Sequence, residues 1–177
     1  YINEDSQVSV SVAAGNEGAA QHHYTAELNG GRNQNIVELR IAEGEQGFSM
    51  ECWGDPPDDY GISVQSPAGE TLYVSSSLGA GTQELSFNFV ETKVLINYVR
   101  MERLTGKQLI YFRFFHPAAG IWKIHVSKRE GPGSRFHMWL PVQGLISAET
   151  YFLESTPYST VTSPGDSSRS ITAAAYQ

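Results

Sequence analysis

Apolar and polar residues alternate along most of the chain between residues 34 and 141, and this alternation limits the possible folds more than any other feature. A segment with this period has one apolar face, as expected of a β-strand that is buried on one side. The pattern predicts about eight short strands. Their apolar positions are Val37-Leu39-Ile41, Phe48-Met50-Cys52, Ile62-Val64, Leu72-Val74, Leu85-Phe87-Phe89, Ile110-Phe112-Phe114, Trp122-Ile124-Val126 and Phe136-Met138-Leu140.

Turn-forming residues separate these strands. The stretches are GDPPDDYG, SPAGE, LGAGTQ, HPAAG and REGPG, in which Gly allows positive φ and Pro cannot donate a ladder hydrogen bond. Antiparallel strands with one apolar face each must pack as a sandwich or a barrel. We therefore predict an all-β fold, an antiparallel jelly-roll β-sandwich. Only residues 90–106, VETKVLINYVRMERLTG, are also compatible with one or two amphipathic helical turns.

The two ends of the chain differ from the middle. VSVSVAAG, residues 8–15, and ITAAAYQ, residues 171–177, are continuous runs of small and β-branched residues. Such runs are typical of strands that are covered on both faces in a parallel sheet. Residues 144–160 are polar and are expected to form a return connection. From these ends we expect the chain to be a piece of a longer protein.

Charge and composition exclude several partners. The formal net charge is −7 and no basic run could follow a phosphate backbone, so nucleic acid is not expected to bind. No apolar run approaches the ~18 residues that a membrane span needs, so no membrane partner is expected. The single cysteine, Cys52, lies in an alternating strand and is expected to be a buried thiol.

Both ends carry motifs of a known family. VAAGNEG, residues 12–18, resembles the strand and loop that carry the oxyanion-hole asparagine of subtilisin-like serine proteases, and this asparagine would be Asn16. SPGDSSRSITAAAYQ, residues 163–177, is similar to the subtilase segment in which a short Pro-containing loop enters the next core strand. About 140 residues lie between the two motifs here, whereas a short stretch separates them in an ordinary subtilisin.

The intervening residues have a resemblance of their own. DDYGISVQSPAGETLYV, PAAGIWKIHV and GSRFHMWLP are similar to strands and turns of proprotein-convertase P-domains. As a whole, the chain resembles the jelly-roll domain inserted into the catalytic domain of clostridial-type subtilases related to the germination proteases. This resemblance implies a subtilase remnant over residues 1–24, an inserted jelly roll over 25–143, and a return connection with a subtilase core strand over 144–177.

The resemblance also implies that the catalytic residues and the sandwich have separate roles. A subtilase uses Asp, His and Ser as its catalytic residues, and all three would lie outside this chain, so the chain alone is expected to be inactive. The sandwich would brace the catalytic domain or shape the access of substrates, and no cofactor is implied. Its partners would be the rest of the catalytic domain and, with it, a protein substrate or pro-segment. The bacterial resemblance and the lack of disulfides favour a cytoplasmic or spore-associated compartment over secretion.

Several other residues have two interpretations. His22 and His23 could act as a base or ligate a metal, but we expect packing histidines at the root of the insertion. A hydrolase built on Ser167 or Ser168 lacks the Gly-x-Ser-x-Gly elbow. A calcium site is conceivable in the loop that holds three carboxylates, but this loop departs from the EF-hand pattern and a solvated turn is favoured. The three carboxylates belong to Asp55, Asp58 and Asp59.

The alternative function, binding of glycan or protein, rests on the three tryptophans. Exposed Trp rings could stack on sugars, so a stand-alone jelly-roll module that binds glycan or protein remains the alternative. Trp122 and Trp139 lie in strands of the expected sandwich, although the period of two puts Trp139 on the face opposite Met138 and Leu140. Trp122 is therefore the expected core residue, and the sequence does not decide the place of Trp53.

Overall fold

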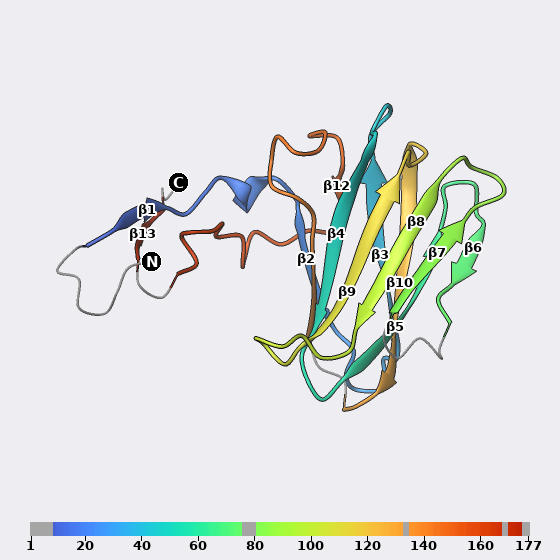
Figure 1. Ribbon diagram of the computed structural model, residues 1–177, viewed down its shortest axis with the longest axis horizontal. Helices are drawn as coiled ribbons and strands as arrows, with labels where there is room; N and C mark the ends of the chain where they lie inside the picture. Colours follow the sequence, from blue (N-terminus) through green and yellow to red (C-terminus); the bar gives the residue numbers. More distant parts are fainter. Residues whose placement is uncertain (1–8, 76–80, 133–134, 168–169, 175–177) are drawn as a thin grey trace.

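Two antiparallel sheets packed face to face make up most of the molecule, and a short parallel pair of strands projects from one end (Figure 1). The computed structural model describes residues 9–75, 81–132, 135–167 and 170–174. The larger sheet has six strands in the order β2-β11-β4-β9-β8-β7. Their bounds in that order are His23–Glu27, Arg135–Trp139, Gly47–Gly54, Gln108–Phe115, Lys93–Val99 and Gly81–Ser86.

The second sheet has five strands in the order β12-β3-β10-β5-β6. Consecutive strands often lie in opposite sheets, since the chain passes from β3 to β4 and from β9 to β10 across the sandwich. The predicted all-β antiparallel sandwich is therefore confirmed. The bounds of the five strands are Tyr151–Phe152, Gln34–Ile41, Gly120–Glu130, Asp59–Gln65 and Thr71–Tyr73.

The core lies between the two sheets and is filled by the alternating apolar residues. Trp122 is fully buried. Its ring makes T-shaped contacts with the rings of Phe87 and Phe114, at centroid distances of 5.1 and 5.6 Å. Its indole nitrogen donates to the carbonyl of Ala118, so the polar atom is satisfied. Cys52 is also buried as expected, and burial raises the pKa of its thiol to about 12.

Residues 144–160 contribute more to the sandwich than a return connection would. Tyr151–Phe152 forms β12 at the edge of the five-stranded sheet, where it pairs with Arg40 and Leu39 of β3. Phe152 is fully buried, and its ring lies 6.0 Å from that of Tyr24. Tyr151, Phe152 and Leu153 are three consecutive apolar residues without alternation, so no period of two revealed this strand.

Two further expectations are corrected in the region of β7 and β8. The alternation was expected to run through Phe89, but β7 ends at Ser86 and Phe89 is 73% exposed. The carboxylate of Glu70 accepts the backbone N–H groups of Asn88 and Phe89, which turns the chain away from the sheet. The helical alternative for residues 90–106 is wrong at β8, which pairs with both β7 and β9.

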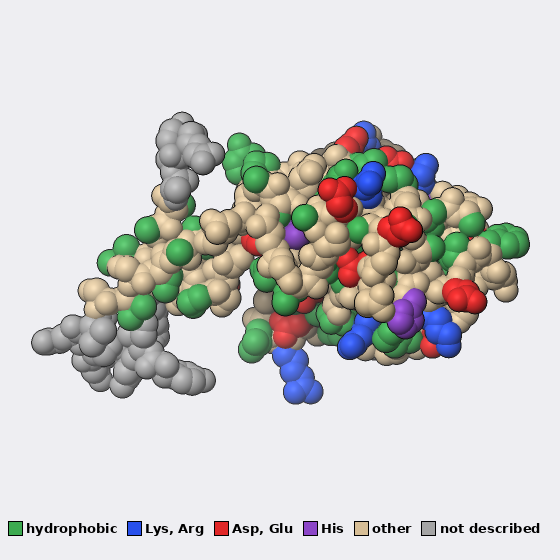
Figure 2. Space-filling view, turned by 90° about the horizontal axis from the view of Figure 1, so that it is seen from above, with side chains coloured by type: hydrophobic (Ala, Val, Ile, Leu, Met, Phe, Trp, Pro, Cys, Tyr) green, Lys and Arg blue, Asp and Glu red, His purple; other side chains and the backbone are tan. Residues whose placement is uncertain are grey.

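The parallel pair belongs to a projecting arm, which we define as residues 9–20 and 157–174. Its strands are β1, Ser11–Ala13, and β13, Ile171–Ala173, and β1 is followed by a short 3-10 helix, Glu17–Ala19. On the face seen in Figure 2, charged side chains gather over the sandwich and the arm carries mainly uncharged ones. Among the residues described, no helix is long and apolar enough to cross a membrane.

The chain enters and leaves the sandwich at the same end. Leu140 donates its backbone N–H to the carbonyl of His22 at 2.9 Å, and Gln143 donates to the Glu17 carboxylate at 2.9 Å. Ala20 and Gly144 line one cavity. The first strand of the sandwich is β2, and the two connections between the sandwich and the arm lie side by side.

Candidate functional site

Asn16 lies at the tip of the loop that follows β1. It is exposed, it precedes the 3-10 helix with φ −118° and ψ 19°, and its side chain makes no capping hydrogen bond to that helix. Gly15 before it has φ +90°, a left-handed conformation that suits glycine. The side-chain amide of Asn16 is thus presented on a tight turn at the surface of the arm.

The return segment supports this loop from behind. Thr162 donates its backbone N–H to the carbonyl of Ala14 at 3.0 Å, and Ala14 donates to Ala173 of β13 at 2.9 Å. A Cβ atom added at Gly165 would lie 3.0 Å from the carbonyl oxygen of Ala13, so the two chain segments are in close contact. Residues about 150 positions apart thereby fix the backbone around Asn16.

His22 lies at the junction of the arm and the sandwich. It is 5% exposed, and its Nδ1 lies 3.1 Å from Oε2 of Glu17. The other oxygen of Glu17 accepts the backbone N–H of Gln143. One carboxylate thus joins the entering strand to the departing one, which agrees with the interpretation of His22 as a packing residue.

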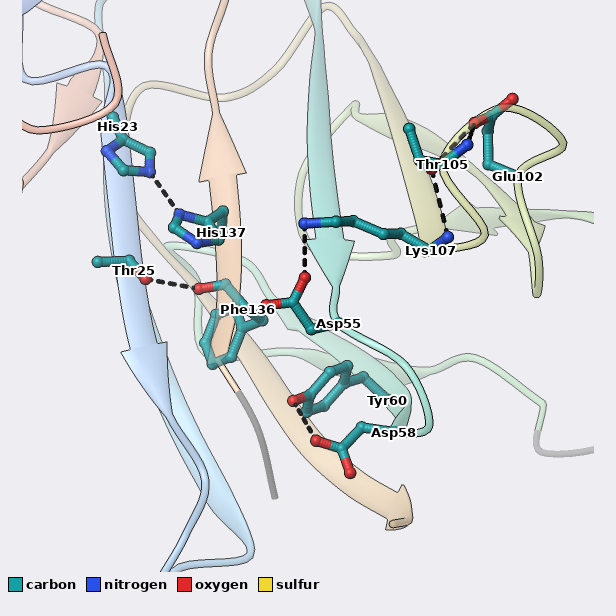
Figure 3. A network of polar contacts seen from close by, with 10 residues as sticks. All are labelled: His23, Thr25, Asp55, Asp58, Tyr60, Glu102, Thr105, Lys107, Phe136 and His137. Atoms are coloured by element: carbon teal, nitrogen blue, oxygen red, sulfur yellow. Dashed lines mark hydrogen bonds and ion pairs between the residues drawn. The ribbon is translucent and has the colours of Figure 1, made fainter. Parts of the chain in front are cut away.

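His23 belongs to a cluster of three rings on the outer face of the six-stranded sheet. Its Nε2 lies 2.9 Å from Nδ1 of His137 (Figure 3). Both imidazoles also stack on Trp139, with centroid distances of 4.8 Å for His23 and 5.1 Å for His137. Sequence reasoning singled out neither His137 nor this pairing, although the period of two places His137 and Trp139 on one face.

The surroundings of the two imidazoles favour their neutral forms. Burial lowers the pKa of His23 below its ordinary value of 6.5, and the neighbouring His137 lowers it further. The backbone groups of Tyr158 and Thr156 oppose this shift but do not outweigh it. Burial also lowers the pKa of His137, against the opposing effect of the Asp55 carboxylate. Two neutral imidazoles can share one hydrogen bond, with one ring donating and the other accepting.

The three carboxylates of the GDPPDDYG loop face different partners. Asp55 forms an ion pair with Lys107 at 2.6 Å, and buried Asp58 accepts a hydrogen bond from the hydroxyl of Tyr60 at 3.0 Å (Figure 3). Asp59 accepts from the side-chain amide of Gln108. No group of three or more His, Cys, Asp or Glu side chains among the described residues is arranged to hold a metal ion.

The tryptophans divide between the core and the outer face. Trp122 is buried as expected, whereas Trp53 and Trp139 are half-buried on the outer face of the six-stranded sheet. The Trp53 indole donates to Glu51 at 2.8 Å, and the Trp139 indole donates to the carbonyl of Ser159 at 3.1 Å. The return segment therefore contacts Trp139, and the indole N–H of each of these two rings has a partner.

Ser167 and Ser168 were the two serines weighed as nucleophiles. Ser167 lies in the loop before β13, where its backbone N–H donates to the carbonyl of Pro164 at 3.1 Å. Ser168 lies outside the described residues.

Comparison with known proteins gives a relationship in structure only. No protein-family model matches the chain, and no curated protein matches its sequence. The structure of the CspB protease from Clostridium perfringens is similar, with a TM-score of 0.81 at 22% sequence identity. This chain shares its fold with part of a clostridial protease. The match covers 96% of the chain and 35% of that protease, so the chain spans about a third of its length.

Proposed function

We propose that the chain is part of a subtilisin-like serine endopeptidase, with a non-catalytic β-sandwich inserted between two short segments of the catalytic domain. The observation that carries this proposal is the parallel pairing of β1 with β13 outside the sandwich. Parallel strands occur almost only in sheets covered on both faces, and an isolated two-stranded pair is marginal in water. Yet β13 is exposed along its length, and Ile171 is 62% exposed. The pair is best explained as two neighbouring strands of a larger parallel sheet.

The surface of the arm and of residues 142–156 before it supports the same proposal. Large apolar side chains are exposed along the return segment and β13, where the rest of the catalytic domain would cover them. On this proposal residues 1–24 and 144–177 belong to the catalytic domain and 25–143 form the insertion. The exposed apolar residues are Val142, Leu145, Leu153, Tyr158, Val161 and Ile171.

Asn16 would serve the reaction through its side-chain amide. An oxyanion hole needs a preorganised donor beside the carbonyl under attack. The tight turn at Gly15 and the contact with Thr162 hold the Asn16 backbone, and its side chain is exposed and makes no capping bond. The nucleophile, base and orienting carboxylate would come from the remainder of the polypeptide. The sandwich, joined by two adjacent connections, would brace that domain or shape access of a protein substrate or pro-segment.

One experiment tests the assignment on the chain itself. A fluorophosphonate probe labels an activated serine, so the chain alone should remain unlabelled, whereas the full-length polypeptide should label stoichiometrically at a serine beyond residue 177. Labelling of the isolated chain would contradict the proposal. Replacing residues 25–143 of the full-length protein by a short loop then separates the two roles: a brace predicts loss of thermal stability, and an access function predicts a broader range of cleaved substrates.

A glycan-binding module is the second candidate, and the outer face of the six-stranded sheet supports it. Trp53 lies beside Leu109, and Tyr111 lies beside Glu51 in the next cross-strand pair, so aromatic rings and a carboxylate share this face. Such rings can stack on sugars. A glycan-binding screen of the chain, with Trp53→Ala as the control, would support this function if the variant loses a measurable affinity.

A further inference from the structure

Three rings connect the sandwich to the return segment. We use the term latch for His23, His137 and Trp139 together with residues 156–163, which lie against them. His23 and His137 are stacked with an angle of 8° between their planes and share a hydrogen bond of 2.9 Å. Trp139 is nearly parallel to both rings.

Hydrogen bonds tie the return segment to these same residues. Thr156 donates its backbone N–H to the carbonyl of His23 at 2.9 Å. The indole of Trp139 donates to the carbonyl of Ser159 at 3.1 Å. Further along, Thr162 donates to Ala14 beside the Asn16 loop. Residues 156–163 thus contact β2 and the Trp139 ring at one end and the Asn16 loop at the other.

Cavities lie on both sides of the return segment. One, of about 230 Å³, is lined by His22, His23, Trp139 and residues 159–163. The other, of about 400 Å³, is lined by His23, His137, Thr156 and Tyr158 among others. Both cavities are large enough for water, which gives protons access to the rings and gives the segment room to move.

In the described part of the chain, the carboxylates near His23 and His137 already have other partners, so none is free to compensate the charge of a second protonated imidazole. His137 is influenced by Asp55, Lys107 and Arg135, and Asp55 and Arg135 already have partners in Lys107 and Glu27. From β4, Glu51 lies opposite Trp139 in the cross-strand register, and its carboxylate accepts the Trp53 indole. On the side of the arm, Glu17 is paired with His22.

We propose that the latch is sensitive to pH. Protonation of both His23 and His137 breaks the hydrogen bond between them and releases residues 156–163 from the sandwich. One added proton leaves the bond possible, because a protonated ring can donate to a neutral one. With two added protons the facing nitrogens are both donors, and two positive rings stack at 5.2 Å.

The direction of the pH effect follows from the lowered pKa values of both rings. The closed latch favours neutral histidines, so the open state binds more protons than the closed state. The contribution of the two histidines to the stability of the closed latch is therefore fully present above the ordinary histidine pKa of about 6.5. It is lost progressively as the pH falls below this value. If the proposed protease function holds, opening also frees the backbone support of Asn16, but the latch itself does not depend on that function.

Amide hydrogen exchange on this chain tests the latch directly. Protection of the Thr156 and Thr162 amides, corrected for the intrinsic pH dependence of exchange, should fall roughly tenfold per pH unit below the histidine pKa for each extra proton that the open state binds. The amides of β9, far from the latch in the middle of the six-stranded sheet, serve as the internal reference. Constant protection of Thr156 and Thr162 down to about pH 5 would overturn the proposal.

A double variant isolates the two rings. In His23→Gln the amide takes the place of Nε2, and in His137→Asn it takes the place of Nδ1, so the pair can keep a hydrogen bond that does not titrate. Its protection should be independent of pH, and a pH dependence equal to that of the wild type would contradict the latch. His125→Asn, in the other sheet, is the matched control, and its Thr156 and Thr162 amides should show the same pH dependence of protection as in the wild type. If the double variant does not fold, half-exposed His137→Asn alone should show a shallower dependence.

Discussion

The side chain of Thr162 occupies the space into which a Cβ atom at Gly15 would project, so these two residues, nearly 150 positions apart, can meet only if position 15 is glycine. Gly15 also has φ +90°, which side chains rarely tolerate. The contact joins the loop that carries Asn16 to the return segment. A motif that was recognised in the sequence is thus supported by a segment that was treated as a connection.

Gly15→Ala should loosen the arm while leaving the sandwich folded. The left-handed conformation costs a residue with a side chain about 1–2 kcal/mol, and the contact with Thr162 adds to this cost. We expect faster hydrogen exchange at the Thr162 amide and an unchanged melting temperature of the sandwich. Gly18→Ala is the control, because a Cβ there would meet only Thr160 at an ordinary 3.9 Å. Equal effects of the two substitutions would contradict this account.

Trp122→Ala should destabilise the whole sandwich. The side chain is fully buried between Phe87 and Phe114, and removing a buried Trp costs about 3–5 kcal/mol, enough to unfold many single domains. Urea denaturation would measure the loss. Trp53→Ala, on the half-buried outer face, should cost clearly less. A Trp122 variant within about half a kcal/mol of the wild type would disprove its core position.

The inner faces of the strands were predictable, because burial of one face requires a period of two. Met50, Cys52, Phe112 and Phe114 are all buried where the alternation placed them. The period does not say which strands are neighbours, however, and the sheet order depends on connections that carry no pattern. Phe152 shows the limit, since it lies between Tyr151 and Leu153 in a strand of two residues, which is too short to show a period of two.

The candidate site was predictable only where it was local in sequence. Asn16 was proposed from seven contiguous residues and stays a prediction, whereas the pairing of His23 with His137 requires β2 and β11 to be adjacent in the sheet. These residues lie 114 positions apart, and the sequence singled out His23 but gave no reason to pair it with His137. A contact between distant strands follows from sheet order, which a single sequence does not specify.

Gln108→Leu should cost about 1–3 kcal/mol, because it leaves buried backbone groups without partners. Gln108 is 3% exposed; its Oε1 accepts the N–H of Tyr60 at 2.9 Å, and its Nε2 donates to Asp59 at 2.7 Å. The substitution keeps the volume but removes both functions. Gln65→Leu, whose amide lies at the exposed turn before β6, is the control. Chemical denaturation should show a loss for Gln108 alone, and equal losses would argue against the buried network.

His125 should make the stability of the sandwich depend on pH independently of the latch. Burial lowers the pKa of His125, with a smaller contribution from Lys123, and its Nδ1 lies 3.0 Å from the amide nitrogen of Gln34. A lowered pKa means that the unfolded chain binds the proton more readily, so the free energy of unfolding should decrease as the pH falls below about 6.5. Denaturation at several pH values would show a weaker dependence in His125→Asn. An identical pH dependence in both proteins would rule out this contribution.

Asn16→Ala should leave the stability of this chain unchanged and lower the turnover of the full-length protease. In this chain Asn16 is exposed and makes no capping bond to the 3-10 helix, so its removal should leave the melting temperature within the error of measurement. In the full-length protease the same change removes one donor of the proposed oxyanion hole, a loss that costs about 10²–10³-fold in kcat in subtilisin-type sites. Because the donor acts on charge that develops in the transition state, KM should change little. Asn16→Asp is the matched variant, since it keeps the shape and cannot donate. A normal kcat in both variants would remove Asn16 from the reaction, whereas a large loss of stability in the isolated chain would show that its role is structural.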